Sequence, residues 1–221
     1  PDGFTSKIHQ LSYIDNYDVA ALEIDAPDSL GHFAFDIRMP QVGDEVALLG
    51  NRIETNSTDG GLVLSKRLDF LFGTVTNITL GASRQKQSYC FETTIPIVSG
   101  MSGAPILINP RTGDQASVCG VASFDVSESQ AFTDFMISGN SSVSGLLPLL
   151  GLALKVRIEE QNARYVPFSE LWERGFIGRQ QTDLEVRVDH CGDSTKIYYK
   201  DLRESPPKQL LYEMTKHPYI E

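Results

Sequence analysis

The chain has 221 residues, 41% of them hydrophobic, which is enough to bury the core of one sizeable domain or of two small barrels. Its formal net charge of −10 argues against a broad nucleic-acid or anionic-membrane surface, because clustered Lys and Arg side chains hold such partners. No apolar run approaches the roughly 20 residues of a membrane helix. Residues 1–4 lack the pattern of a signal peptide and look like an internal cut.

Up to about residue 155, short apolar or alternating segments are separated by turn signals, a pattern typical of an all-β sandwich or barrel. The expected strands cover residues 7–13, 19–24, 45–49, 70–78, 89–94, 105–108 and 118–124. Turns are expected at residues 59–61, 109–113 and 138–140.

After about residue 155 the pattern predicts a small α+β extension of unknown role. Residues 169–174, followed by Gly175, are expected to form a short capped helix. The alternation over residues 184–188, a turn at 191–193 and a return strand at 197–199 predict a β-hairpin. Residues 207–216 are predicted to form a terminal helix that begins at a proline.

Three cysteines, Cys90, Cys119 and Cys191, lie far apart without a C-x-x-C pair, which disfavours a zinc site and allows at most one disulfide. We expect Cys90 and Cys119 to be buried thiols. No His, Cys and carboxylate residues show the spacing of metal ligands, and no phosphate-binding loop is present. The sequence therefore implies no metal and no organic cofactor.

The segment with the clearest chemistry is Gly100-Met101-Ser102-Gly103-Ala104-Pro105. A serine nucleophile needs a base to take its proton and donors to stabilise the oxyanion that follows attack on a carbonyl. Gly100 permits a tight loop in which the N–H groups of Gly100 and Ser102 converge on one oxygen, and Gly103 leaves room for substrate above the serine. Pro105 favours a following strand over a helix.

This loop resembles the nucleophile loop of trypsin-like (chymotrypsin-fold) serine peptidases, and residues 17–22, Tyr-Asp-Val-Ala-Ala-Leu, resemble the motif of that family's triad aspartate. Residues 40–51, 73–76 and 120–124 are similar to successive strands of the family, so the resemblance covers about residues 5–155. It implies a double β-barrel in domain 1–155, with a remnant of the first barrel over about 1–40 and the second over about 41–155. Residues 156–221 would be the extension.

The resemblance implies that Ser102 and Asp18 are triad members. Their separation of 84 residues (102 − 18) is close to the roughly 93 of the chymotrypsin triad. In that triad the histidine precedes the aspartate by roughly 45 residues, whereas only 17 residues precede Asp18. His9 stands only nine positions before Asp18 (18 − 9), where the family has no catalytic residue. We therefore expect the 221 residues alone to be inactive, because triad members act as a unit.

The resemblance also implies a substrate cleft. Residues 120–124 match the strand that lies beside bound substrate in this family, so Ser123, Phe124 and Asp125 are expected to line the cleft. Pro96 stands six positions before Ser102, near the primary specificity pocket. A preference for Arg or Lys is not expected, because Pro96 is not acidic. The alternative is that the apolar residues 95–97 merely fill the core of the barrel. The expected partner is a protein or peptide substrate, not a nucleic acid or a membrane.

Three functions remain open from the sequence. A serine endopeptidase is the leading interpretation. The alternative is a catalytically inactive homologue that binds a protein partner, which an upstream histidine in the full-length protein would argue against. An α/β-hydrolase is disfavoured because its G-x-S-x-G elbow leads into a helix, whereas here Ala104 takes the fifth position and a β-like run follows.

Overall fold

The computed structural model describes residues 7–14, 19–25, 31, 33–58, 61–79, 89–98, 100–111, 116–123, 141–146, 155–158, 164–167, 172–173, 183–192 and 194–215. Most of them are in strands, which confirms the predicted all-β class. Contacts divide the chain into two compact units, Phe35–Leu146 and the remainder, Pro1–Ala34 with Leu147–Glu221. Within the described ranges, no helix is long and apolar enough to span a bilayer.

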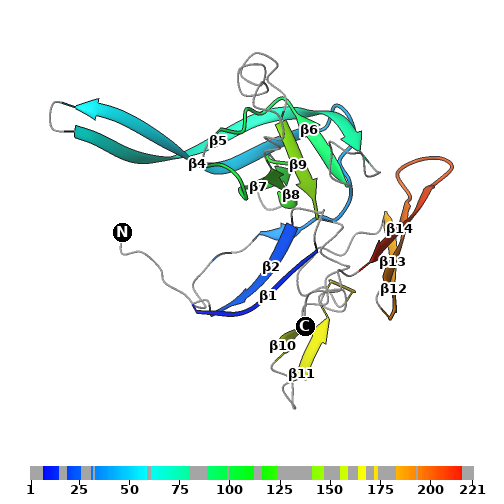
Figure 1. Ribbon diagram of the computed structural model, residues 1–221. Coiled ribbons are helices and arrows are strands. Elements are labelled where there is room, and N and C mark those ends of the chain that lie inside the picture. Colours follow the sequence, from blue (N-terminus) through cyan, green and yellow to red (C-terminus); the bar gives the residue numbers. More distant parts are fainter. Residues whose placement is uncertain are drawn as a thin grey trace. The chain divides into compact units, whose positions relative to one another are not determined.

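A closed barrel of six strands forms the unit Phe35–Leu146 (Figure 1). Its strands are β4 (Glu45–Thr58), β5 (Gly61–Thr79), β6 (Cys90–Thr93), β7 (Pro105–Ile108), β8 (Ser117–Ser123) and β9 (Ser141–Gly145). They follow the antiparallel order β8-β7-β4-β5-β6-β9, and β9 also pairs with β8, which closes the ring. Closure leaves the barrel without free edges, and the short β3 (Ala34–Phe35) lies beside β8.

Alternation along the strands fills the barrel with apolar side chains. Val46 and Leu48 of β4, Phe91 of β6 and Ile106 of β7 are completely buried in one cluster. Both cysteines that were predicted to be buried, Cys90 and Cys119, are buried free thiols, whereas Cys191 is exposed.

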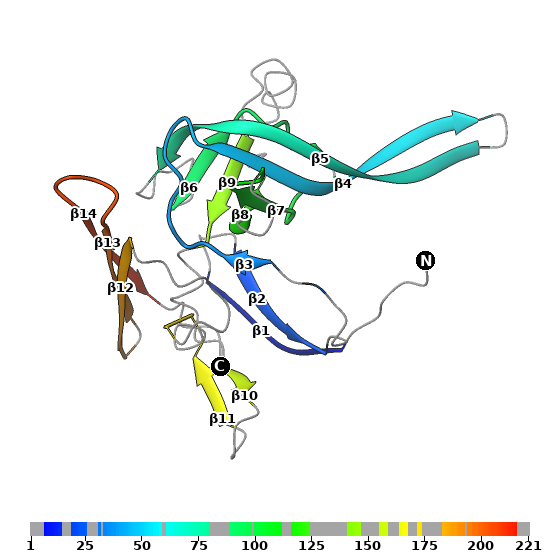
Figure 2. The same ribbon diagram turned by 180° about the vertical axis from the view of Figure 1, so that it is seen from behind.

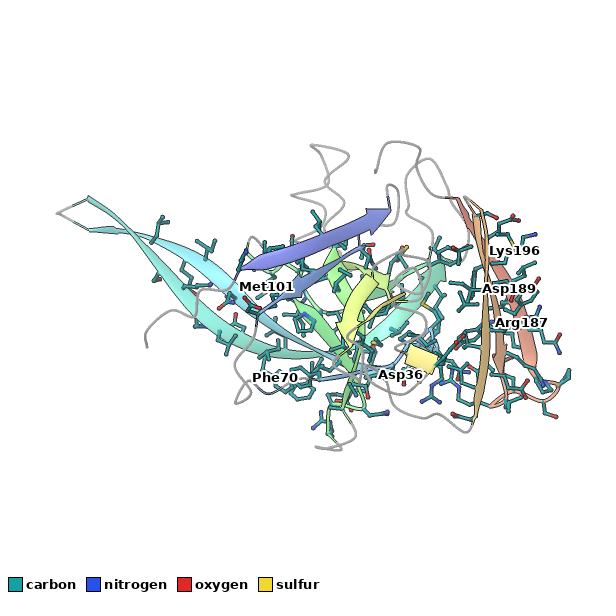
Figure 3. The ribbon with its side chains drawn as sticks, turned by 90° about the horizontal axis from the view of Figure 1, so that it is seen from below. Asp36, Phe70, Met101, Arg187, Asp189 and Lys196 are labelled. Atoms are coloured by element: carbon teal, nitrogen blue, oxygen red, sulfur yellow. The ribbon has the colours of Figure 1, made fainter. Side chains whose placement is uncertain are left out.

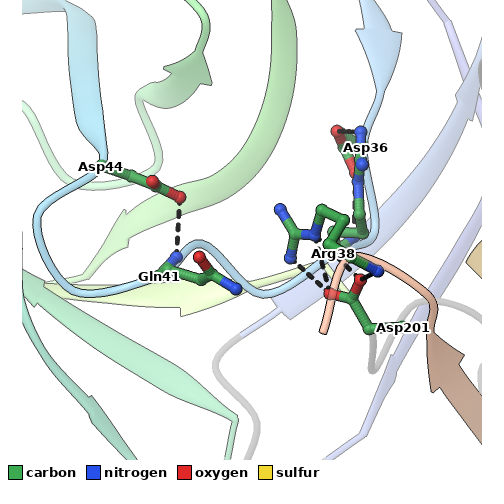
Figure 4. A network of polar contacts seen from close by, with 6 residues as sticks. Asp36, Arg38, Gln41, Asp44 and Asp201 are labelled. Carbon is green, nitrogen blue, oxygen red and sulfur yellow. Dashed lines mark hydrogen bonds and ion pairs between the residues drawn. The ribbon is translucent and has the colours of Figure 1, made fainter. Parts of the chain in front are cut away.

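The connection from β3 to β4 is held by short polar contacts (Figure 4). The backbone N–H of Gln41 donates to Asp44 Oδ2 at 2.7 Å, and Gly43 turns the chain with a φ of 94°. The Arg38 guanidinium lies 3.0 Å from the buried carboxylate of Asp36, which offsets the cost of burying that charge. These contacts set the point at which β4 enters the barrel.

Strands β4 and β5 are much longer than the predicted segments 45–49 and 70–78. β4 pairs with β7 only over Val46–Leu48, and beyond that point it continues with β5 as a two-stranded ribbon out to the pair Thr58↔Gly61. Figures 1 and 2 show this ribbon extending away from the barrel. Residues 49–58 and 61–70 form this part and are named the β4–β5 arm. Of the turn predicted at 59–61, residues 59 and 60 lie outside the described residues.

An ionic cluster stabilises the base of the arm. Asp69 is only 6% exposed, and its carboxylate lies 2.6 Å from Arg67 Nε and 3.0 Å from Arg52 Nε. The hydrogen bond from Arg67 holds the pKa of Asp69 below its ordinary value. The charged carboxylate is thus the form that the arm stabilises.

The other unit contains β1 (Ile8–Ile14) paired with β2 (Val19–Ile24), β10 (Lys155–Ile158) paired with β11 (Arg164–Pro167), and a three-stranded sheet. That sheet consists of β12 (Leu184–Cys191), β13 (Ser194–Asp201) and β14 (Lys208–Thr215). The predicted hairpin over 184–199 is confirmed by the pairing of β12 with β13. One face of the sheet is polar and carries Arg187, Asp189 and Lys196 (Figure 3).

The terminal helix predicted over 207–216 is wrong, because this segment forms β14. Its residues are mostly good helix formers, but pairing with β13 places Tyr212 opposite Ile197 and buries both side chains. This burial outweighs the small intrinsic preference for a helix. Of the helix predicted over 169–174, only Trp172 and Glu173 are among the described residues, and their backbone is helical.

Candidate active site

The predicted nucleophile loop, residues 100–104, precedes β7 and lies along the edge of β4 that β7 leaves unpaired. A Cβ placed on Gly100 would lie 3.0 Å from Asn51 O and 2.9 Å from Ile53 Cγ1. A Cβ on Gly50 would lie 3.2 Å from Ala104 Cβ. The start of the arm therefore forms one wall of the loop.

Two consecutive β-turns shape this loop. Met101 N–H donates to Val98 O and Ala104 N–H donates to Met101 O, each at 3.0 Å. Gly100 and Gly103 stand at the third position of these turns with φ values of 92° and 81°. A positive φ at that position is the mark of a type II turn and favours glycine. The turn geometry thus accounts for both glycines that flank Ser102.

The loop is fastened to the barrel from two sides. The Met101 side chain is completely buried in the barrel core (Figure 3). On the β8 side, Gly103 N–H donates to Ala122 O at 2.7 Å, and Ala122 N–H donates to Ala104 O at 2.8 Å. Sequence reasoning missed the anchoring role of Met101, although an apolar residue between Gly100 and Ser102 was a visible signal for it.

The polar groups at the centre of the loop are available for a ligand. Ser102 is exposed, and no atom lies within 4 Å of the point where a Cβ on Gly103 would be. The N–H groups of Met101, Gly103 and Ala104 are hydrogen-bonded. Within the described part of the chain, the N–H groups of Gly100 and Ser102 have no hydrogen-bond partner. The loop therefore presents two backbone donors beside an exposed hydroxyl.

The other predicted site residues differ in how far the structure describes them. Ser123 is buried at the end of β8, directly after Ala122, to which the loop is bonded. Pro96 is exposed, whereas its neighbours Ile95 and Ile97 belong to the barrel core. Asp18, Phe124 and Asp125 lie outside the described residues, as does the side chain of His9.

Neither a metal nor a reactive thiol is indicated near this loop. Among the described residues, no three His, Cys, Asp or Glu side chains lie close enough together to hold a metal ion. Burial raises the pKa of the Cys119 thiol well above its usual value, and Cys119 Sγ donates a weak hydrogen bond to Ile106 O at 3.5 Å. A thiol of this kind is inert, because the thiolate is the nucleophilic form.

The family model for the trypsin-like peptidase domain matches residues 3–121, more than half of the chain. This chain belongs to the trypsin-like peptidase domain family. The match extends from just before β1 into β8 and includes the loop around Ser102. No curated protein matches the chain. The trypsin-like domain is thus a peptidase by family, on an all-β fold with a closed barrel.

Proposed function

We propose that this trypsin-like domain belongs to a serine endopeptidase in which Ser102 is the nucleophile. Ser102 Oγ attacks the carbonyl carbon of a peptide bond while a histidine takes the hydroxyl proton, and the N–H groups of Gly100 and Ser102 bind the resulting oxyanion. The histidine returns the proton to the leaving amine, and water then hydrolyses the acyl-enzyme. Asp18 orients the histidine.

The observation that carries this proposal is the pattern of hydrogen bonds in the loop. Hydrogen-bonded and unbonded N–H groups alternate along the loop. Those of Met101 and Gly103 are bonded within the barrel, while those of Gly100 and Ser102 have no partner among the described residues. Unbonded N–H groups at the central positions of β-turns are common, but here two of them lie in one loop, beside an exposed hydroxyl. This is the arrangement that an oxyanion site requires, because its donors must be in place before the charge develops.

The substrate is a protein or peptide that lies across the loop. Ser123 ends the strand to which the loop is bonded, Phe124 and Asp125 come next in the sequence, and Pro96 is exposed between two core residues. We propose that these four residues line the substrate cleft. Pro96 carries no charge, so an apolar or small side chain suits the specificity pocket better than Arg or Lys.

The base is not expected among the four histidines of residues 1–221, because none has the family's spacing to Asp18. The test compares labelling by a fluorophosphonate of the 221 residues and of the protein extended by the residues that its gene encodes before Pro1. Ser102→Ala in the extended protein is the control. We expect labelling of the extended protein at Ser102, at least about a thousandfold faster than that of the 221 residues.

Two other results would contradict this assignment. Equal and rapid labelling of both proteins would place the base within residues 1–221, with His9→Ala as the first variant to examine. An extended protein that carries a histidine at the family position and still resists labelling would overturn the proposed reaction.

The alternative is a catalytically inactive homologue that binds a protein partner. It is favoured by the fact that the anchors of the loop among the described residues lie within the barrel, since such a loop keeps its geometry whether or not a base is present. An extended protein that folds, lacks the upstream histidine and is not labelled would establish this alternative.

A further inference from the structure

One face of the β4–β5 ribbon carries a row of apolar side chains, interrupted on β5 by Lys66. Leu64, Leu68, Phe70 and Phe72 are separated by even numbers of residues along β5, so they point to the same face. Ile53 of β4 is directly opposite Lys66, and residues directly opposite in an antiparallel pair share a face. Ile53 thus lies diagonally between Leu64 and Leu68. The arm stripe consists of Ile53, Leu64, Leu68, Phe70 and Phe72.

The arm stripe is exposed along its whole length. Its side chains are 44–67% exposed, with the larger values at Leu64 and Leu68, toward the tip of the arm. At the barrel end, the Phe70 and Phe72 rings pack edge to face at 4.8 Å, and the Arg111 guanidinium lies over Phe72 (Figure 3 labels Phe70). Single apolar side chains are ordinary on a surface, whereas five of them gathered on one face of a ribbon offer an area on which an apolar segment can pack.

The arm stripe is continuous with the nucleophile loop. Ile53 Cγ1 packs against Gly100, 2.9 Å from the point where a Cβ would be. The opposite side of the loop is bonded to Ala122 of β8. The loop thus lies between Ile53 and Ala122, and a polypeptide that runs from the end of β8 across Ser102 would reach the side of Ile53.

We propose that the arm stripe docks an extended apolar segment of the polypeptide substrate, on the side of the scissile bond remote from β8. This inference rests on the proposed function of Ser102. Side chains at alternate positions of the bound segment would pack on Ile53, Leu64 and Leu68. The stripe would thus select substrates by residues that are not at the bond to be cleaved.

The size of the stripe fits a single extended segment better than a second copy of the chain. From Leu64 to Phe72 the strand spans about 26 Å, and the ribbon is about 10 Å wide, giving a face of about 260 Å². This is about a third of the roughly 800 Å² that each partner buries in a standard protein interface. An extended peptide of about eight residues has the same length as the stripe.

The test measures binding, so it requires no turnover. The 221-residue protein with Ser102→Ala is titrated into a fluorescein-labelled octapeptide of alternating leucine and serine, with an asparagine–serine octapeptide as the control ligand. The test variant replaces Ile53, Leu64 and Leu68 with serine. The matched control variant replaces Leu11, Leu22 and Leu211, which are similarly exposed and lie in the other unit, with serine.

We expect the stripe variant to bind the leucine peptide about tenfold more weakly or worse, because apolar contact area is lost at three positions. The control variant should change the affinity by less than about twofold, since it leaves the stripe intact. A photo-reactive benzophenone group on the peptide should cross-link to residues 53–68 of the parent protein.

Equal weakening by both variants, no binding of the leucine peptide by the parent protein, or cross-links outside the arm would overturn the inference. A concentration-dependent dimer that the stripe variant abolishes would assign the surface to a second copy instead. Fluorophosphonate labelling of the extended parent protein reports on the proposed function separately. If the extended parent protein is labelled at Ser102 but the stripe variant binds the leucine peptide as well as the parent does, the docking surface is refuted and the proposed function stands.

Discussion

Replacement of Gly100 by alanine probes both the strain and the crowding of the nucleophile loop. Gly100 has a φ of 92°, which an alanine rarely adopts, and a Cβ there would lie 3.0 Å from Asn51 O and 2.9 Å from Ile53 Cγ1. Gly103 has a similar φ of 81°, but no atom lies within 4 Å of its Cβ position. Gly103→Ala is therefore a matched control that carries the strain without the crowding.

The two penalties can be estimated separately. Holding a non-glycine residue at such a φ costs about 1–3 kcal/mol, so Gly103→Ala should lower the free energy of unfolding by about that amount. Gly100→Ala adds the cost of displacing its neighbours. Ile53 is half exposed and can change rotamer, whereas Asn51 O belongs to the backbone and cannot move alone. We expect an additional penalty of about 1 kcal/mol for Gly100→Ala.

Urea unfolding followed by far-ultraviolet circular dichroism measures both variants against the parent. The midpoint should fall for each, and further for Gly100→Ala, without a change in the slope m. Equal midpoints for the two variants would show that the arm does not form a wall of the loop. An unchanged midpoint for both would refute the positive φ at the two glycines.

Three other residues carry predictions of stability or reactivity. Met101→Ala should cost about 2–5 kcal/mol of unfolding free energy because the side chain is completely buried, whereas Leu211→Ala, at an exposed site, should change it by less than about 0.5 kcal/mol. Ellman's reagent should titrate one thiol, Cys191, in the native protein and all three in denaturant; rapid reaction of Cys119 would contradict its burial and raised pKa. The Arg67 hydrogen bond lowers the pKa of Asp69. The Asp69 carboxylate therefore stabilises the fold above the ordinary pKa of an aspartate, and this stabilisation is lost as the pH falls below about 4. Asp69→Asn should therefore flatten the decline of the urea midpoint between about pH 5 and 2, and a parallel decline in both proteins would count against the ionic cluster.

Local patterns were sufficient to predict several short strands and the loop. The strands predicted at 19–24 and 105–108 match the observed bounds. Each is a short apolar run between turn signals, which is typical of a buried strand. The positive φ values of Gly100 and Gly103 follow from the need to turn twice within the seven residues 98–104. Both features depend on neighbouring residues, which is why the sequence alone could indicate them.

The arm and β14 could not be predicted in the same way. Residues 51–58 are mostly polar and have no clear strand pattern, and they are extended because their partners in β5 hold them in register from Gly50↔Asp69 to Thr58↔Gly61. In β14, helix-forming residues are extended because β13 offers Ile197 and Tyr199 for packing. In both cases the strand is stabilised by pairing with another strand. The periodicity of a single segment does not show such a partner.

The nucleophile loop and the aspartate that should orient its base are built by separate parts of the chain. Every anchor of the loop, from Met101 to Ala122 and Ile53, lies within residues 35–146, whereas Asp18 precedes them. In the extended protein, Asp18→Asn should slow fluorophosphonate labelling of Ser102 by up to about 10⁴-fold, because the histidine loses its orienting partner. If the anchors within residues 35–146 are enough to hold the loop, the penalty of Gly100→Ala should remain the same within about 0.5 kcal/mol in the Asp18→Asn background. A larger coupling would mean that Asp18 helps to hold the loop, and that the barrel alone does not build the oxyanion site.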